Sequence, residues 1–301
     1  MVILMVRGGQ LCNRLLSISA FVANSIEHNY PMICSSFDDY YDKFASINKS
    51  SSPYNIRFLK SKHYVQKLFI KFLYKYISMF PKSAERLGLI IYPGNENINI
   101  PGFIEKAIKN KLFVQGWPYW DVNNFIKHSN EIRNIFTPKQ EYFDCVAAFL
   151  DKLDPSYTAL VGVHVRRGDY KNYINGRFYF STETYLNKMQ ELNLELISLN
   201  KKPIFIICSD EIFAADQNQD FPYVFSSLDD VSDLILLSKC HYIFGPPSTY
   251  SMWASFYGNV PYNNFFSEDE ILKVEDFSPI IAPSTYANGR VLKDVYERYS
   301  T

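Results

Sequence analysis

The stretch Val161-Gly162-Val163-His164-Val165-Arg166-Arg167-Gly168-Asp169-Tyr170 decides how the rest of the sequence is interpreted. Residues 158–165 are apolar and rich in β-branched side chains, which predicts a strand buried on both faces of a parallel sheet. In an open α/β sheet, ligands bind just outside the carboxyl ends of the strands. The loop that follows this strand is therefore the first candidate for a binding site.

Two adjacent arginines open that loop. On an extended backbone, Arg166 and Arg167 point to opposite sides, so one can face a cleft while the other braces the loop. A guanidinium group stays charged and matches two phosphate oxygens at once. The alternative is a structural salt bridge with Asp169, and the residues alone leave both interpretations open.

The same residues carry a family resemblance. Segment 164–170 resembles the His-x-Arg-Arg-x-Asp signature of the α-1,2-, α-1,6- and protein O-fucosyltransferases, and its Gly-Asp-Tyr form is closest to the bacterial α-1,2-fucosyltransferases. Segment 233–253 is similar to that family's Asp-Leu-x-Leu-Met-Ser-x-Cys block and its Ser-Thr-Phe-Ser-Trp-Trp block. It departs from them at Pro246, Pro247 and Met252. The resemblance covers most of the chain.

A glycine-rich loop follows the first apolar run. A strand over 2–6, this loop and a helix over 15–28 predict the opening of a Rossmann-like unit, without the Gly-x-Gly-x-x-Gly dinucleotide fingerprint. The loop resembles the Gly-Gly-x-Gly-Asn-Gln loop of the α-1,2-fucosyltransferases, with Cys12 and Arg14 as departures. The resemblance places these residues near donor or acceptor: Gly8, Gly9, Asn13 and Arg14. A tight turn alone would also explain the glycines.

Composition indicates a globular protein of two domains. The chain has 301 residues, of which 47% are hydrophobic, and its net charge is zero. Residues 1–150 carry 18 Lys and Arg against 11 Asp and Glu, whereas residues 151–301 carry 13 against 20. The basic half favours an anionic partner or surface, but no nucleic-acid motif accompanies it. We place the domain boundary near residue 155, giving domains 1–155 and 156–301.

Cysteine usage and hydropathy favour a cytoplasmic location. The five cysteines form no CxxC pair, which predicts a reducing compartment without disulfides or a zinc site. Neither a signal peptide nor a run of about 18 apolar residues is recognised. Asp38-Asp39 is not the Asp-x-Asp of metal-dependent glycosyltransferases, so we interpret it as a solvated loop and expect no metal. Residues 263–274 are interpreted as an acidic linker.

Residues 62–80 predict a basic amphipathic helix. Large apolar residues recur at helical spacing, and Lys67, Lys71 and Lys75 repeat every four residues on another face. Packing of the apolar face on a core is one interpretation, with the lysines in solvent. The other is that these lysines contact an anionic inner membrane or a lipid-phosphate carrier.

The resemblance implies a GT-B fold, in which two Rossmann-like domains face each other across a cleft. The C-terminal domain would bind GDP-fucose, the last helix (291–299) could return to the first domain, and residues 1–155 would bind the acceptor glycan. The expected donor-binding residues are His164, Arg166, Arg167, Asp233, Ser248, Thr249 and Ser251. Aromatic rings that could stack on acceptor sugars are Trp117, Tyr119 and Trp120, although core packing would equally explain each of them.

The expected chemistry is an inverting, metal-independent transfer of L-fucose. Arg166 would stabilise the charge that develops on the leaving GDP, and Asp169 is the carboxylate in the motif that could act as base. An α-1,2 linkage on a surface polysaccharide such as an O-antigen, carried on a polyprenyl diphosphate, follows from the resemblance. Two alternatives remain: a related glycosyltransferase with another sugar nucleotide, and a non-catalytic nucleotide-binding module.

Overall fold

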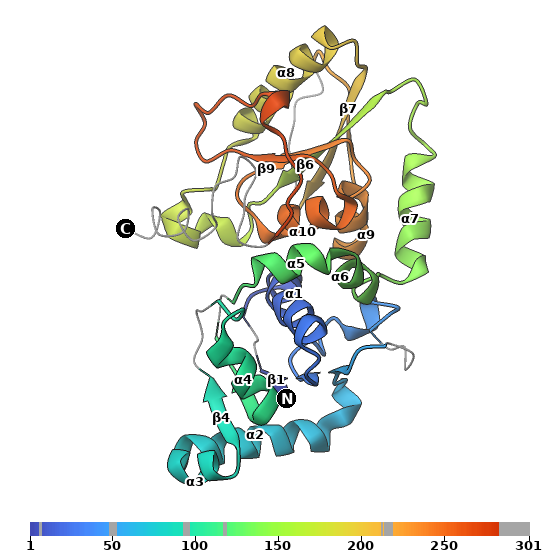
Figure 1. Ribbon diagram of the computed structural model, residues 1–301. Helices are drawn as coiled ribbons and strands as arrows, with labels where there is room; N and C mark the ends of the chain where they lie inside the picture. The colour runs from blue at the N-terminus through green and yellow to red at the C-terminus, as the bar shows by residue number, and fades with distance from the viewer. Residues whose placement is uncertain are drawn as a thin grey trace. The chain divides into compact units, whose positions relative to one another are not determined.

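The structure is a computed structural model that describes residues 1–5, 8–47, 53–92, 97–116, 119–211, 213 and 219–282. The chain forms two compact units, Met1–Lys139 (unit 1) and Gln140–Thr301 (unit 2). Each unit contains a five-stranded parallel sheet with helices around it (Figure 1). The predicted α/β fold class with two Rossmann-like units is therefore confirmed.

Unit 1 is built on the sheet order β3-β2-β1-β5-β4. Its strands are β1 (Val2–Leu4), β2 (Met32–Cys34), β3 (Ile56–Phe58), β4 (Leu89–Tyr92) and β5 (Lys111–Val114). Its helices are α1 (Leu11–His28), α2 (Tyr64–Met79), α3 (Pro81–Arg86), α4 (Pro101–Lys109), α5 (Val122–Lys127) and α6 (Ser129–Ile135). Two single turns, η1 (Tyr41–Lys43) and η2 (Ser61–His63), lie in its loops.

Unit 2 is built on the sheet order β10-β9-β6-β7-β8. Its strands are β6 (Ala159–Val165), β7 (Pro203–Ser209), β8 (Tyr223–Phe225), β9 (Tyr242–Gly245) and β10 (Tyr262–Asn264). Its helices are α7 (Gln140–Leu150), α8 (Thr182–Ser198), α9 (Asp230–Leu237) and α10 (Thr249–Gly258). Single turns are η3 (Asp169–Lys171), η4 (Tyr173–Gly176) and η5 (Val274–Asp276).

The central strand β6 is packed so closely that two glycines are required around it. A Cβ atom on Gly162 would lie 2.6 Å from the Leu237 side chain of α9. A Cβ atom on Gly245, at the end of β9, would lie 2.4 Å from the His164 carbonyl oxygen. These close contacts hold α9 and β9 against β6. The residues that follow β6 and β9 are therefore held together at the carboxyl ends of these strands.

Each sheet has one point where the strand order reverses. In unit 2, β6 pairs with β7 on one side and with β9 on the other. In unit 1, β1 pairs with β2 on one side and with β5 on the other. Ligands of open α/β sheets bind outside the carboxyl ends of the strands at such switch points. Each unit therefore offers one position where its topology favours a ligand.

Helix α2 forms as predicted, but only part of its apolar surface faces the sheet and one of its lysines is buried. Ile70 and Ile77 pack on the sheet with Ile3 and Phe113, and Lys67 is buried and pairs with Asp38 at 2.5 Å. Leu73, Tyr74 and Tyr76 also pack against this core, whereas Val65, Leu68, Phe69, Phe72 and Met79 point into solvent. The expectation that an apolar face packs on the core therefore holds for Ile70, Leu73 and Ile77, and Lys71 and Lys75 are exposed as expected. It fails for Lys67, which pairs with the largely buried Asp38, and for the phenylalanines, because the sheet accepts only a narrow apolar stripe.

Two other details of the chain's organisation depend on packing. The division between the units falls earlier than residue 155, because α7 packs against α9 of unit 2. The expected linker 263–274 begins inside β10, where Asn263 and Asn264 are buried. The expected final helix at 291–299 lies outside the described residues. No helix in the described ranges has the length and hydropathy needed to span a bilayer.

Candidate active site

Arg166 lies just past the carboxyl end of β6, at the switch point of unit 2. Its Nη2 is 2.7 Å from Asp169 Oδ1, and its Nη1 is 2.8 Å from Asp210 Oδ2. Val165 pairs with Ser209, the last residue of β7, so Asp210, which follows β7, lies opposite Arg166. The Arg166 side chain is 19% exposed, so its charged fork is held in one orientation while a ligand can still reach it.

Arg167 points the other way and braces the loop. Its Nε donates to the Phe180 carbonyl oxygen at 3.2 Å, and its Nη2 donates to Thr182 Oγ1 at 2.8 Å. The guanidinium also lies over the rings of Tyr185 and Phe213. Arg167 is buried, so its polar groups are used inside unit 2. The structure therefore has the predicted arrangement, in which Arg166 stays accessible to a ligand and Arg167 braces the loop.

Asp210 fixes the start of the loop. Besides Arg166, it accepts a hydrogen bond from the Arg167 backbone N–H at 2.9 Å. A Cβ atom on Gly168 would lie 2.9 Å from Asp210 Oδ2, so the loop passes the carboxylate too closely for a side chain there. Among the described residues, Asp169 has no such anchor, and its side chain is 58% exposed. Of the two carboxylates on Arg166, Asp210 is therefore fixed and Asp169 is displaceable.

The N-terminus of α10 lies beside the same strand end. Ser248 caps the helix by accepting from the Tyr250 backbone N–H at 3.2 Å, and Thr249 follows half-buried in the first turn. Ser251 is buried, and its Oγ shares a 2.7 Å hydrogen bond with Nδ1 of His164 in β6. Tyr170 of the arginine loop donates to the Pro247 carbonyl oxygen. A helix N-terminus carries partial positive charge, which adds to that of Arg166.

His164 is a neutral structural link between β6 and α10. Burial, with a smaller contribution from the nearby Arg166 charge, lowers the pKa of His164 to about 3. Its ring lies 4.9 Å from that of Tyr250, whose hydroxyl donates to the Asp230 carbonyl oxygen at 2.6 Å. His164 thus holds the first turn of α10 in place and stays uncharged near neutral pH.

Asp233, in the first turn of α9, is partly buried beside β7 and β8. It accepts a hydrogen bond from Ser226 Oγ, and the Cys208 thiol also contacts it. Burial is the largest effect on this carboxyl and raises its pKa to about 6. A carboxylate with a raised pKa at a sheet edge is a frequent property of functional sites.

Sequence reasoning omitted Asp210 and Tyr250 from the candidate site. A signal for Asp210 was available, since Ser209-Asp210 ends an apolar strand that runs beside the arginine strand. Tyr250 gave no separate signal, because its contact with His164 depends on where α10 begins. Both residues act by holding Arg166, His164 and the helix in register.

The glycine loop of unit 1 is fastened by Arg14. Gly9 has φ of +68°, and a Cβ atom there would lie 2.0 Å from the Asn13 side chain, so glycine is required. Arg14 is buried, and its Nη1 donates to the Ser36 carbonyl oxygen at 3.0 Å and to Asp39 Oδ2 at 2.7 Å. Gly8 and Gly9 are exposed. The loop thus presents backbone to solvent while Arg14 anchors it.

The aromatic residues expected to stack on an acceptor are placed differently from one another. Tyr119 is 2% exposed, packs edge-on against Phe21 and donates to the Gln115 carbonyl oxygen at 2.6 Å, so its ring belongs to the core. Trp120 is half-buried, and its carbonyl oxygen accepts from the Ile98 N–H. Trp117 lies outside the described residues. Tyr119 therefore offers no ring face to a sugar in this structure.

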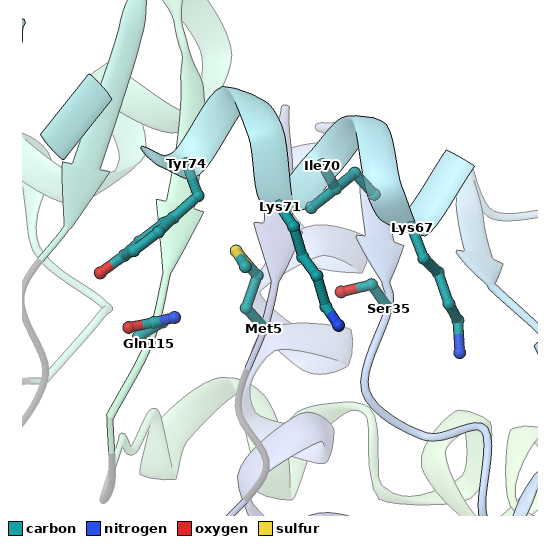
Figure 2. A pocket seen from close by; sticks show the side chains of 7 residues that line it. All are labelled: Met5, Ser35, Lys67, Ile70, Lys71, Tyr74 and Gln115. Carbon is teal, nitrogen blue, oxygen red and sulfur yellow. The ribbon is translucent and has the colours of Figure 1, made fainter. Parts of the chain in front are cut away.

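A cavity of about 260 Å³ lies at the switch point of unit 1. Its floor includes Met5 and Gln115, which directly follow β1 and β5, and Ser35, which follows β2. Figure 2 shows Lys71 extending from α2 between Met5 and Ser35, with Tyr74 and Gln115 at the other end. Within the part of the chain that the structure describes, no carboxylate pairs with Lys71. The cavity thus gathers a cation, a phenol and an amide.

The expectation of a solvated loop at Asp38-Asp39 holds for Asp39 and fails for Asp38. The Asp39 side chain is 53% exposed while it pairs with Arg14, whereas Asp38 is largely buried against Lys67. Across the described ranges, no group of three His, Cys, Asp or Glu side chains is arranged to hold a metal ion.

Comparison with known proteins gives a family and a fold. The model of glycosyl transferase family 11 matches residues 108–260, about half of the chain. That range includes the arginine loop, Asp210, Asp233 and the start of α10. Comparison with curated proteins gives no match.

Solved structures of fucosyltransferases share the fold. Arabidopsis thaliana FUT1, a mutant in complex with GDP, has a TM-score of 0.60 and 11% identity, and covers 96% of this chain and 78% of its own. NodZ from Bradyrhizobium has a TM-score of 0.57 and 14% identity, and the match covers 86% of this chain and 93% of NodZ. The structure of the α-1,6-fucosyltransferase NodZ soaked with GDP-fucose has a TM-score of 0.52 and 13% identity, and the match covers 88% of this chain and 94% of NodZ.

Proposed function

This chain belongs to glycosyl transferase family 11, and from that premise we propose that it transfers L-fucose from GDP-fucose to a hydroxyl group of a glycan. The family makes the protein a glycosyltransferase. The observation that carries the choice of donor is the site in unit 2, where a fixed guanidinium and a helix N-terminus meet at a switch point. The similar folds that have been solved with GDP or GDP-fucose support the same donor.

The diphosphate of the donor would bind Arg166 in place of Asp169. The exposed Asp169 carboxylate neutralises one edge of the guanidinium, and a phosphate can offer negatively charged oxygens to the same edge. Asp210 would keep the other edge of Arg166 in position. Ser248, Thr249 and Ser251 would direct the first turn of α10 at the phosphates, while Asp233 would accept hydrogen bonds from the guanine or the ribose.

The transfer breaks the bond between fucose C1 and the β-phosphate oxygen, and the acceptor oxygen forms the new bond on the opposite face of the sugar. Negative charge grows on the leaving GDP, and the fixed positive charge of Arg166 stabilises it. The sugar becomes oxocarbenium-like, as in glycoside hydrolysis. Asp169, once displaced from Arg166, is our candidate to accept the proton of the attacking hydroxyl.

The acceptor would use the cavity of unit 1. Its polar lining of Lys71, Tyr74 and Gln115 offers donors and acceptors to sugar hydroxyls, and the tyrosine ring adds an apolar face. We further propose that fucose is attached in an α-1,2 linkage to a galactoside. This galactoside would belong to a surface glycan such as an O-antigen, carried on a polyprenyl diphosphate. Cys34, Cys208 and Cys240 are buried free thiols, which supports our proposal of a protein of the reducing cytoplasm.

A sugar-nucleotide screen tests this function. The purified protein is incubated with GDP-fucose, GDP-mannose and UDP-galactose, with and without a β-galactoside, and both nucleotide release and glycoside formation are measured. We expect release from GDP-fucose and inversion at the anomeric carbon. Turnover of a different sugar nucleotide would favour another transferase, and nucleotide binding without turnover would favour a non-catalytic module.

GDP binding is expected to be independent of divalent metal. Arg166 and the α10 N-terminus supply the positive charge that a metal ion provides in other sites. Calorimetry should give the same affinity in EDTA and in magnesium. Asp169→Asn, which removes the competing carboxylate, should bind GDP more tightly. An affinity that disappears in EDTA contradicts this expectation.

Lys71→Ala and Gln115→Ala are each expected to raise the KM for a β-galactoside acceptor about tenfold, the scale of one lost hydrogen bond to a charged or well-placed group. Hydrolysis of GDP-fucose without acceptor should stay unchanged, because the donor site lies in unit 2. Lys106→Ala, an exposed lysine of α4, is the matched control. An unchanged acceptor KM in both cavity variants would remove the cavity from the acceptor site.

A further inference from the structure

Helix α2 presents a second apolar face to solvent, besides the one that packs on the sheet. Val65, Leu68, Phe69, Phe72 and Met79 lie at helical spacing on this side, and Phe80 follows at the end of the helix. Phe69 is 59% exposed and Phe72 is 65% exposed, whereas the opposite side of the helix holds the buried Lys67. Contiguous apolar surface of this kind on a soluble fold marks an interaction site. We call these six residues the α2 apolar face.

Positive charges accompany the α2 apolar face. Lys75 on α2 and Lys82 and Arg86 on α3 are exposed, and none of the three forms a salt bridge within the described residues. Glu85 is the one acidic residue between positions 64 and 86. Figure 1 shows α3 following directly on from α2, so the helix that carries Lys82 and Arg86 adjoins the one that carries Lys75.

We propose that the α2 apolar face docks onto the surface of an anionic lipid bilayer. Phenylalanine and leucine side chains would enter the boundary between headgroups and acyl chains, and Lys75, Lys82 and Arg86 would meet the anionic headgroups. An apolar stripe edged by lysine and arginine is the pattern of helices that lie in a membrane interface. The proposal does not depend on the transfer reaction, because it rests on α2 and α3 alone.

Charge decides between a bilayer and a second copy of this chain. Two copies that paired through this face would bring Lys75, Lys82 and Arg86 near the same cations of the partner, with Glu85 as the acidic counterpart on these helices. An anionic bilayer instead complements every one of these charges and accepts the apolar side chains. The buried Ile70 and Ile77 hold the helix on the sheet, so docking requires no unfolding.

Vesicle co-sedimentation tests the proposal. The full chain is mixed with phosphatidylcholine vesicles and with vesicles that also contain phosphatidylglycerol. We expect binding to the anionic vesicles. Phe69→Ser/Phe72→Ser should weaken it at least about tenfold, since two exposed aromatic side chains no longer enter the interface. Lys75→Gln/Lys82→Gln should weaken it about fivefold per lysine at low salt, and the difference should shrink in high salt.

A matched control excludes a general effect of surface hydrophobicity. Leu194 and Ile197 of α8 have the same spacing as Phe69 and Phe72, and they are 59% and 53% exposed. Leu194→Ser/Ile197→Ser should bind vesicles as the unaltered protein does, and circular dichroism should give the same fold for all variants. Equal binding by the Phe69→Ser/Phe72→Ser variant would overturn the proposal. So would a dimer, by light scattering, that only this variant dissociates.

Discussion

Arg166→Lys is expected to lower the rate of sugar transfer about a hundredfold, the scale for losing one preorganised donor at a developing charge. Lysine keeps the positive charge, but its single ammonium cannot span Asp169 and Asp210, which contact separate nitrogens of the guanidinium at 2.7 and 2.8 Å. The charge would then stand away from the leaving phosphate. The loss is measured as the decrease in kcat in steady-state kinetics, with GDP-fucose in excess.

Two controls separate this role from stability. Arg57→Lys, an exposed arginine of β3, should leave kcat unchanged. Arg167→Lys should mainly lower the melting temperature, because Arg167 is buried and its fork binds Phe180 and Thr182 inside unit 2. A folded Arg166→Lys enzyme with nearly normal kcat would refute the assigned role, and a large loss of kcat in a stable Arg167→Lys enzyme would exchange the two roles.

Asp233→Asn is expected to stabilise the protein at neutral pH by about 2 kcal/mol while weakening GDP binding. The carboxyl is held largely away from water, so its pKa rises from 3.8 to about 6 and its ionised form is unfavourable in the fold. One pKa unit corresponds to about 1.4 kcal/mol, and partial solvent access reduces the full value. Asparagine keeps an acceptor for Ser226 without the charge.

The pH dependence gives this prediction its sign. A carboxyl whose pKa is raised in the fold binds its proton more tightly in the folded than in the unfolded protein. Its stabilising contribution is complete below about pH 4 and is lost as the pH rises through about 6. Asp233→Asn avoids that loss, so its advantage in melting temperature should be small at pH 4.5 and largest above pH 7.

The function of Asp233 supplies the second readout. At pH 7 the wild-type carboxylate is mostly ionised and can accept hydrogen bonds from a guanine or a ribose, whereas the asparagine cannot replace both of its oxygens. Calorimetry should give weaker GDP binding for Asp233→Asn together with higher thermal stability. Lower stability at pH 7 would contradict the burial argument, and unchanged GDP affinity would remove Asp233 from the donor site.

The sequence by itself determined the elements that depend on local pattern. A short, continuous run of β-branched apolar residues is typical of a buried strand, which predicted β6, and helical spacing predicted α1 and α2. The strand, glycine-rich loop and helix at the start of the chain predicted one Rossmann-like unit, and the family resemblance implied the second. The segment 164–170 also identified Arg166 without any coordinates, because a charged pair directly after a buried strand has to lie at the sheet edge. Short strands such as β3 carry too few residues for a pattern.

Only the tertiary structure decided which side of each element faces the core. Periodicity separated the lysines of α2 from its apolar residues but could not say which apolar residues, and which lysine, the sheet would bury. That choice depends on Ile70 and Ile77 fitting the sheet and on Asp38 reaching Lys67. The partner of Arg166 likewise followed from register, because the alignment of β6 with β7 brings Asp210 to it from more than forty positions away. Contacts between distant residues are set by packing, which local sequence does not encode.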